Sequence, residues 1–303
     1  MAYVAGMRVI ISGASGLIGS ALAGSLEADG HSVVRLVRRP AGQGEIHWDP
    51  MGGVLDASAL GGADAVVHLA GAGIGDRRWT EAYKREILES RVRGTELLAA
   101  RIAECDQRPP VLLSGSAIGV YGPSDGRDLD ESSPTSTDFL ADVCRQWEQA
   151  TAPAEAAGVR VVHLRTGIVL TPRGGALAKM LPLFRFGLGG RFGNGRQWQS
   201  WISLDDEVGA IRHLLTSDLR GPVNLTAPAP VTNSEFARTL GRVLSRPAVF
   251  PVPPIGPRLL LGRELADALL FTGQKVLPSA LQGDGYGFAH PDLESALRSL
   301  LGR

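Results

Sequence analysis

The feature that most constrains the fold of this chain is a glycine-rich turn close to its start, Gly13-Ala-Ser-Gly16-Leu-Ile-Gly19. An apolar, β-branched run, residues 9–11, stops at this turn, and a helical pattern of apolar residues begins at Leu17. Backbone N–H groups and the positive end of a helix dipole would then meet at one point, where a pyrophosphate can bind. The glycines would serve the tight turn, the close approach of a phosphate and the packing of helix on strand. The turn therefore predicts a dinucleotide-binding βα unit, with a ligand-free glycine-rich turn as the alternative.

The residues that follow the second predicted strand bear on the choice of cofactor. That strand, residues 31–37, comes after a helix ending near Gly30, so a βαβ unit closes within about 30 residues. It ends at Arg38 and Arg39, about 20 residues beyond the last glycine, where an NAD site carries an acid for the ribose hydroxyls. A guanidinium can instead pair with a 2′-phosphate. Solvated loop charges are the alternative, but the missing acid favours NADP(H).

Composition limits the class of protein and its partners. With 303 residues, 44% hydrophobic and 20% charged, the chain is expected to be globular, as a monomer or a homodimer. Its formal net charge is zero, which predicts neither nucleic acid nor a membrane as a partner. Two cysteines, Cys105 and Cys144, make no disulfide framework, and no secretory signal or metal-ligand spacing is visible. These observations predict a cytoplasmic protein without a metal.

Strand-like runs alternate with helical patterns over the first 230 residues. The predicted strands are 8–12, 31–37, 65–69, 111–115, 159–164 and 222–226, and the predicted helices are 17–29, 80–103, 138–157 and 204–216. This alternation predicts an α/β fold, a doubly wound parallel sheet of the Rossmann type with helices on both faces. We expect residues 1–170 plus about 200–230 to form the NADP-binding domain. Residues 171–199 plus 231–303, which are rich in glycine at first and mostly helical later, would form a smaller C-terminal substrate domain.

Several further motifs follow one another in a recognisable order. They are Val66–Gly71, Arg91–Thr95, Ser114–Ser116 before Val120–Gly122, Glu131-x-x-Pro134, Leu164-Arg165 and Trp201–Asp206. With them the chain resembles the extended short-chain dehydrogenases/reductases, the NAD(P)-dependent sugar epimerases and dehydratases. More narrowly it resembles the atypical "epimerase family" subgroup, which has an added C-terminal domain of unknown function. The segments that match this subgroup are Arg77–Trp79, Gly174–Met180, Gly187–Gly190 and Gly273–Pro278.

The resemblance, which covers essentially the whole chain, implies a set of cofactor contacts. The pyrophosphate would lie on Gly13, Ser15, Gly16, Leu17, Ile18 and Gly19, and the adenosine phosphate on Arg38 and Arg39. Leu69, Ala70 and Gly71 would lie beside the adenosine, with Glu86, Arg91 and Arg165 as further contacts. Arg91 replaces the asparagine that is usual in the superfamily, a departure that could add a cofactor contact.

The catalytic pair of the superfamily, Tyr-x-x-x-Lys, is absent from this chain. The lysine normally lowers the pKa of the tyrosine so that the phenol can move a proton. Tyr3, Tyr83, Tyr121 and Tyr286 are followed four residues later by Met7, Ile87, Asp125 and His290. When the helix is aligned on Glu148, Leu140 and Cys144 occupy the positions of the pair. Neither can do the usual work, and Cys144 is interpreted as a packing residue.

Two residues are the remaining catalytic candidates. Ser116 matches the serine that hydrogen-bonds the substrate oxygen, or it satisfies backbone groups at a strand end. Tyr121 is a substitute proton donor, or it packs in the Tyr-Gly-Pro turn, and water is the other donor. The loop Arg196–Trp201 either lines a pocket or packs between the domains.

Two functions remain open. The first is an NADP(H)-binding oxidoreductase or epimerase-like enzyme with a small polar substrate, sugar-like by analogy of fold. The second is a non-catalytic NADP(H) sensor, which the missing Tyr–Lys pair favours. A Rossmann-like methyltransferase fits the glycine spacing less well than a dinucleotide-binding protein does.

Overall fold

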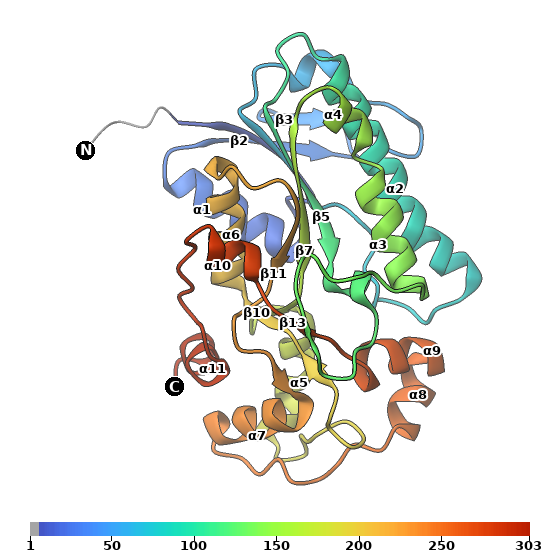
Figure 1. Ribbon diagram of the computed structural model, residues 1–303, viewed down its shortest axis with the longest axis vertical. Coiled ribbons are helices and arrows are strands. Elements are labelled where there is room, and N and C mark those ends of the chain that lie inside the picture. Colours follow the sequence, from blue (N-terminus) through green and yellow to red (C-terminus); the bar gives the residue numbers. More distant parts are fainter. Residues whose placement is uncertain (1–5) are drawn as a thin grey trace.

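A seven-stranded parallel sheet lies at the centre of the computed structural model, which describes residues 6–303 (Figure 1). Its strand order is β11-β7-β5-β4-β1-β2-β3. The strands are β1 (Arg8–Ser12), β2 (Ser32–Val37), β3 (Glu45–His47), β4 (Ala65–His68), β5 (Val111–Ala117), β7 (Arg160–Thr166) and β11 (Gly221–Leu225). All six predicted strands belong to this sheet. The edge strand β3 was not predicted, because three residues are too few for an alternating pattern.

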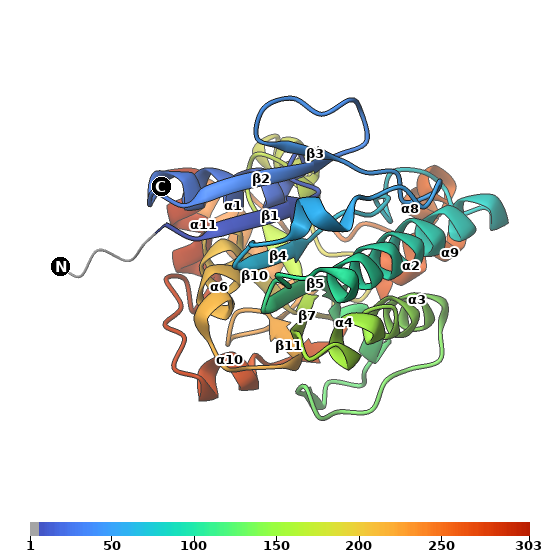
Figure 2. The ribbon, with the colours of Figure 1, turned by 90° about the horizontal axis from the view of Figure 1, so that it is seen from above.

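Helices cover both faces of the sheet. Figures 1 and 2 show α1 (Leu17–Ala28) and α6 (Leu204–Thr216) on one face, and α2 (Glu81–Glu104), α3 (Phe139–Gln149) and α4 (Ala152–Ala156) on the other. The fold is therefore the predicted Rossmann-type α/β architecture. The single helix predicted over 138–157 is wrong: it is divided into α3 and α4 at Ala150–Thr151. Pro153, in the first turn of α4, has no N–H to continue a helix and is tolerated only near a helix start.

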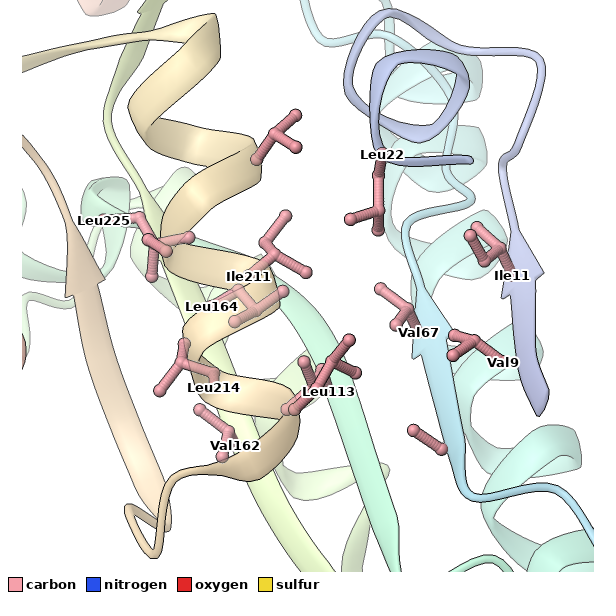
Figure 3. Close-up of a cluster of buried hydrophobic side chains, with 14 of the residues drawn as sticks. Val9, Ile11, Leu22, Val67, Leu113, Val162, Leu164, Ile211, Leu214 and Leu225 are labelled. Atoms are coloured by element: carbon pink, nitrogen blue, oxygen red, sulfur yellow. The ribbon is translucent and has the colours of Figure 1, made fainter. Parts of the chain in front are cut away.

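The alternation of side chains along the strands builds two cores. On the first face, apolar strand residues pack against Leu22 of α1 and Ile211 and Leu214 of α6, and Figure 3 labels Val9, Ile11, Val67, Leu113, Val162, Leu164 and Leu225 among them. On the second face, Ile10, Val66 and Leu112 pack against α2. Toward the carboxyl ends of the strands the second face becomes polar, with Ser12, His68, Ser114, Ser116, His163 and Arg165. This polar stripe positions the candidate site.

Most of the remaining elements lie at one end of the sheet (Figure 1). They include α5 (Gly175–Arg185), α7 (Asn233–Leu244), α8 (Ile255–Leu261), α9 (Arg263–Ala266) and the strand pairs β8 (Ile168–Leu170) with β10 (Trp201–Ser203) and β9 (Trp198–Gln199) with β12 (Val231–Thr232). The chain then returns to the sheet through β13 (Lys275–Val276), which pairs with β6 (Asp128–Leu129), and through α10 (Ser279–Gly283). It ends in α11 (Leu293–Leu301), which packs against α7. Leu281 of α10 is buried in the first core. Within residues 6–303, no helix combines the length and the apolar character needed to cross a membrane.

Candidate functional site

The glycine-rich turn lies where the strand order of the sheet reverses, between β1 and β4. In open α/β sheets this point forms a crevice at the carboxyl ends of the strands. Gly13 has φ +69°, and a Cβ placed on it would lie 2.8 Å from the carbonyl carbon of Leu69. A Cβ on Gly19 would overlap the carbonyl oxygen of Gly13. Both positions therefore require glycine, and the turn packs directly against the Leu69–Ala70 segment after β4.

The N-terminus of α1 opens into this crevice without a side-chain cap. Gly16 is the N-cap residue, and its backbone N–H donates to the carbonyl of Gly13 at 2.9 Å. Gly16 has no side chain that could accept a hydrogen bond, so the backbone N–H groups of the first turn of α1, including those of Leu17 and Ile18, have no side-chain cap. Uncapped N–H groups at the positive end of a helix dipole suit a phosphate. Ser15 and Gly16 are exposed, whereas Leu17 and Ile18 are half-buried.

The two arginines after β2 have different surroundings. Arg39 binds both carboxylate oxygens of Glu45 in β3, at 2.7 and 2.5 Å, although its side chain is largely exposed. Arg38 is exposed, and among residues 6–303 no carboxylate lies within ion-pair distance of it. Glu45 lies in the strand that the sequence did not predict. Because Glu45 neutralises Arg39, Arg38 is the one of the two arginines that has no carboxylate partner within residues 6–303.

Helix α2 carries both Arg91 and Glu86, and the two side chains differ in burial. The Arg91 guanidinium is buried against Gly71, where a Cβ on Gly71 would be 3.3 Å from its Cζ. It donates to the carbonyls of Ala72 and Ile87 at 2.9 and 3.0 Å. No carboxylate in the described part of the chain pairs with it, and burial lowers its pKa. Glu86 is exposed and lies 3.6 Å from Arg77.

A buried network of five side chains lies at the ends of β5 and β7. Ser116 Oγ donates to Glu148 Oε1 at 2.7 Å. Arg165 binds the same carboxylate with Nε at 2.8 Å and Nη2 at 2.9 Å, and its Nη1 donates to the Tyr121 hydroxyl at 2.9 Å. Tyr121 in turn donates to Asn224 Oδ1 at 2.8 Å. Burial alone would raise the pKa of Glu148, but the hydrogen bonds and the charge of Arg165 lower it below its ordinary value.

This network bears on three of the expected site residues. Arg165 lies beside Ser116 in the sheet register, and the structure places its guanidinium against Glu148. Tyr121 is only 4% exposed, burial raises its pKa, and its hydroxyl proton already has an acceptor in Asn224. Burial raises the pKa of the Cys144 thiol to about 12, so the thiol is neutral near pH 7. Ser116 is likewise buried, at 5% exposed, and its hydroxyl proton is donated to Glu148.

Sequence reasoning did not identify three of the polar residues at this edge. Glu148 served only to align the helix, because its contact with Ser116 depends on how α3 packs on the sheet. Ser12 Oγ lies 2.6 Å from His68 Nδ1 and also accepts the N–H of Leu69 at 3.2 Å. This pair joins β1 to β4 beneath the crevice, and burial lowers the pKa of His68 to about 4. A serine and a histidine at the ends of two apolar strands were the available signal.

The loop 196–201 both lines a cavity and packs between elements. A cavity of about 310 Å³ is lined by Pro123, Ser124, Asp125, Asn194, Arg196, Gln197, Trp198, Phe271, Thr272 and Gly273. The ring of Trp198 also lies 4.7 Å from the ammonium of Lys275. Trp201 is fully buried, and its indole nitrogen donates to Ala229 at 3.1 Å. Trp198 therefore lines the cavity, and Trp201 packs in the interior.

A buried acid at the start of α6 gives the protein a pH-dependent stability. Glu207 is fully buried, one oxygen accepts from Thr166 at 2.8 Å, and the other has no partner within residues 6–303. Burial raises its pKa to about 8. The folded state therefore holds a proton that the unfolded state releases above its ordinary pKa, so the contribution of Glu207 to stability falls as pH rises toward 8.

We expect Glu207→Gln to stabilise the protein more at pH 8 than at pH 5. In the unaltered protein, ionisation of Glu207 lowers the free energy of unfolding by up to about 1.4 kcal/mol per pH unit between pH 5 and pH 8, and the variant lacks this dependence. Urea unfolding of both proteins across this range measures the difference. His68, whose lowered pKa makes stability fall as pH drops below about 6.5, is present in both proteins and cancels. An equal gain at pH 5 and pH 8 would contradict the prediction.

Comparison with known proteins adds the following similarities. The model described as "NAD dependent epimerase/dehydratase family" matches residues 9–225, and "Domain of unknown function (DUF1731)" matches residues 252–300. An epimerase family protein of Mycobacterium tuberculosis, MT2273, is 48% identical over 291 residues, 95% of this chain and 96% of that protein. The human epimerase family protein SDR39U1 is 39% identical over 299 residues, 97% of this chain and 100% of that protein.

Solved structures agree with these similarities. The crystal structure of human SDR39U1 isoform 2 with NADPH has a TM-score of 0.90 at 38% identity and covers 98% of this chain and 99% of that chain. A nucleoside-diphosphate sugar epimerase from Corynebacterium glutamicum has a TM-score of 0.78 at 38% identity, covering 98% of this chain and 58% of that one. MoeE5 with UDP-glucose and NAD, at 21% identity and a TM-score of 0.75, shares the fold.

Proposed function

The chain belongs to the NAD-dependent epimerase/dehydratase family, and from that premise we propose that it is an NADP(H)-dependent oxidoreductase or epimerase-like enzyme. One observation carries the proposal. The uncapped glycine turn and the Ser116 hydroxyl lie at the same carboxyl edge of one parallel sheet, on strands separated only by β4. A cofactor along that edge would present its reactive ring near a hydroxyl on a neighbouring strand.

The residues at the edge fit a dinucleotide. The cradle at Gly13 and Gly19 has no room for a Cβ, the first turn of α1 is uncapped, and buried Arg91 has no acidic partner within residues 6–303. Gly13, Ser15, Gly16, Leu17, Ile18 and Gly19 would hold the pyrophosphate, with Leu69, Ala70 and Gly71 beside the adenosine and Arg91 near the ribose or phosphate. The cofactor, when bound, supplies a nicotinamide ring that exchanges hydride.

The protein's own groups bind and orient the substrate. Ser116 would contact the substrate oxygen, and Arg165 and Glu148 hold that serine in one orientation. Proton donation from Tyr121 stays a prediction, since its hydroxyl must first leave Asn224, and water is the alternative donor. The cavity beside Trp198 would take another part of a small polar, sugar-like substrate. MoeE5 and a UDP-glucose 4-epimerase from Thermotoga maritima, which share the fold, have UDP-glucose in their structures.

Preference for NADP(H) is proposed to rest mainly on Arg38, because Glu45 already binds Arg39. We expect Arg38→Ala to weaken NADPH binding by roughly 10- to 100-fold, the effect of one or two charge-assisted hydrogen bonds. NADH affinity should change little. Fluorescence titration of both cofactors measures this, with Arg220→Ala, an exposed arginine just before β11, as the control. NADH binding as tight as NADPH binding in the unaltered protein would contradict the assignment.

The experiment for the whole proposal is a titration with NADPH and NADH, followed by absorbance assays with carbonyl compounds and nucleotide sugars. Tight NADPH binding with oxidation supports the enzyme. Binding without oxidation favours a non-catalytic NADP(H) sensor, which the absence of Tyr-x-x-x-Lys from the sequence, the neutral Cys144 thiol and the committed Tyr121 hydroxyl support. In either role we propose a cytoplasmic monomer or homodimer without a nucleic-acid partner. The two free, buried cysteines support a reducing compartment.

A further inference from the structure

We propose that the buried Glu148–Arg165 ion pair makes Ser116 a hydrogen-bond acceptor toward the substrate, so that this serine recognises a hydroxyl group and not a carbonyl oxygen. The inference rests on the proposed function for the presence of a substrate at Ser116. It goes further because it names the chemical state that the site selects.

The direction of the Ser116 hydrogen bond follows from the groups around it. A serine hydroxyl has one proton and two acceptor lone pairs. Glu148, whose pKa is lowered by Arg165, is a carboxylate near pH 7 and can only accept. The 2.7 Å contact between Ser116 Oγ and Glu148 Oε1 therefore uses the serine proton. Ser116 can therefore only accept a hydrogen bond from another molecule, through its lone pairs.

The other end of the network fixes the same direction. The carbonyl of Leu277 can only accept, so the amide nitrogen of Asn224 donates to it at 3.0 Å. Asn224 Oδ1 is then an acceptor, and the Tyr121 hydroxyl must donate to it. Tyr121 in turn accepts from Arg165, which has no acceptor atoms. Neither hydroxyl proton in this chain of bonds, that of Ser116 or that of Tyr121, is free to turn toward a substrate.

The consequence for recognition is a choice between two oxidation states of one ligand. An alcohol, such as a sugar hydroxyl, can donate to Ser116 and complete its bonding. A ketone in the same place would bring its carbonyl oxygen against the oxygen of a serine whose proton is already used. One hydrogen bond of this kind is worth about 0.5–1.5 kcal/mol, which corresponds to a roughly 2- to 13-fold preference for the alcohol.

The test compares matched alcohols and ketones in the presence of tetrahydro-NADP, an analogue that does not transfer hydride. The probe pairs are glycerol with dihydroxyacetone, cyclohexanol with cyclohexanone, and UDP-6-deoxyglucose with UDP-4-keto-6-deoxyglucose, with affinities measured by ligand-observed NMR titration. We expect the alcohol to bind several-fold tighter in the pairs that bind. Glu148→Ala and Glu148→Asp should each abolish or reverse the preference, since neither leaves an acceptor oxygen within reach of the Ser116 proton.

The two variants distinguish a change in the direction of the Ser116 hydrogen bond from a failure of the protein to fold. Glu148→Asp keeps a negative charge opposite Arg165 but withdraws its oxygens from Ser116, so it tests the serine even where Glu148→Ala fails to fold. Glu104→Gln, an exposed acid at the end of α2, should leave the preference unchanged. A preference that survives both Glu148 variants overturns the inference, as does equal or tighter binding of the ketones.

A second measurement needs no substrate. Neutron diffraction from deuterium-exchanged crystals should place the Ser116 deuteron on the line to Glu148 Oε1, and a deuteron elsewhere overturns the inference. If tetrahydro-NADP binds and no probe of either kind does, the substrate inference fails while the cofactor assignment stands. If the analogue and NADPH both fail to bind, the proposed function itself fails.

Discussion

Replacing Arg165 by methionine is expected to lower the free energy of unfolding by about 3–5 kcal/mol, because the variant leaves the Glu148 carboxylate buried without its cation. In the structure the Arg165 side chain is 7% exposed and that of Glu148 is 13% exposed. Two of the three donors to this carboxylate come from Arg165. Urea unfolding at pH 7 measures the loss, and Arg220→Met, at an exposed position just before β11, is the control, with an expected effect within about 0.5 kcal/mol.

The cause of this loss can be separated from the loss of arginine packing. Without Arg165, burial should raise the pKa of Glu148, so the variant should recover stability as pH falls and the acid becomes protonated. The double variant Arg165→Met with Glu148→Leu removes both charges and should regain much of the lost free energy. A double variant as unstable as Arg165→Met alone would contradict the argument from an uncompensated charge.

Replacing Gly19 by alanine is expected to weaken NADPH binding by roughly 100-fold or more, which corresponds to about 2.8 kcal/mol of binding free energy. The added Cβ would overlap the carbonyl oxygen of Gly13 and displace the turn from the crevice. Gly24→Ala in the same helix is the matched control, because nothing lies within 4 Å of its added Cβ. It should raise stability by about 0.5–1 kcal/mol and leave NADPH affinity unchanged.

Calorimetric titration with NADPH and thermal unfolding of both variants test this contrast. We expect that a moderate increase in cofactor concentration does not restore binding to Gly19→Ala, since the phosphate site itself is displaced. Equal NADPH affinity in the two alanine variants would show that the glycine turn is not part of the cofactor site. Loss of binding in both variants would show a general effect of substitutions in α1.

Local patterns in the sequence were sufficient for the sheet and for the crevice. The apolar runs around Val9 and Val66 are continuous because their strands are buried on both faces, and the glycines mark the one turn that cannot hold a Cβ. The division of α3 from α4 depended on Pro153, a signal that was present but was outweighed by the helical residues around it. The edge strand β3 was too short to leave a pattern.

The polar network could not be read from the chain in the same way. Ser116 and Arg165 are neighbours because β5 and β7 pair in one register, and Glu148 reaches them because of the way α3 packs on that pair. Each contact joins residues that are distant in sequence, and none follows from the period of a helix or a strand. The pairing of Arg39 with Glu45 was hidden for the same reason, since it depends on β3.

The return of the C-terminal segment to the sheet has a consequence for biosynthesis. Every strand of the parallel sheet has been made once Leu225 has left the ribosome, yet Leu281 is still needed in the first core and the Leu277 carbonyl orients Asn224. A nascent chain released before these residues would hold a complete sheet with an unfinished core and an unoriented site. The order of synthesis therefore makes the orientation of Asn224, and with it the direction of the Tyr121 hydrogen bond, one of the last properties that this protein acquires.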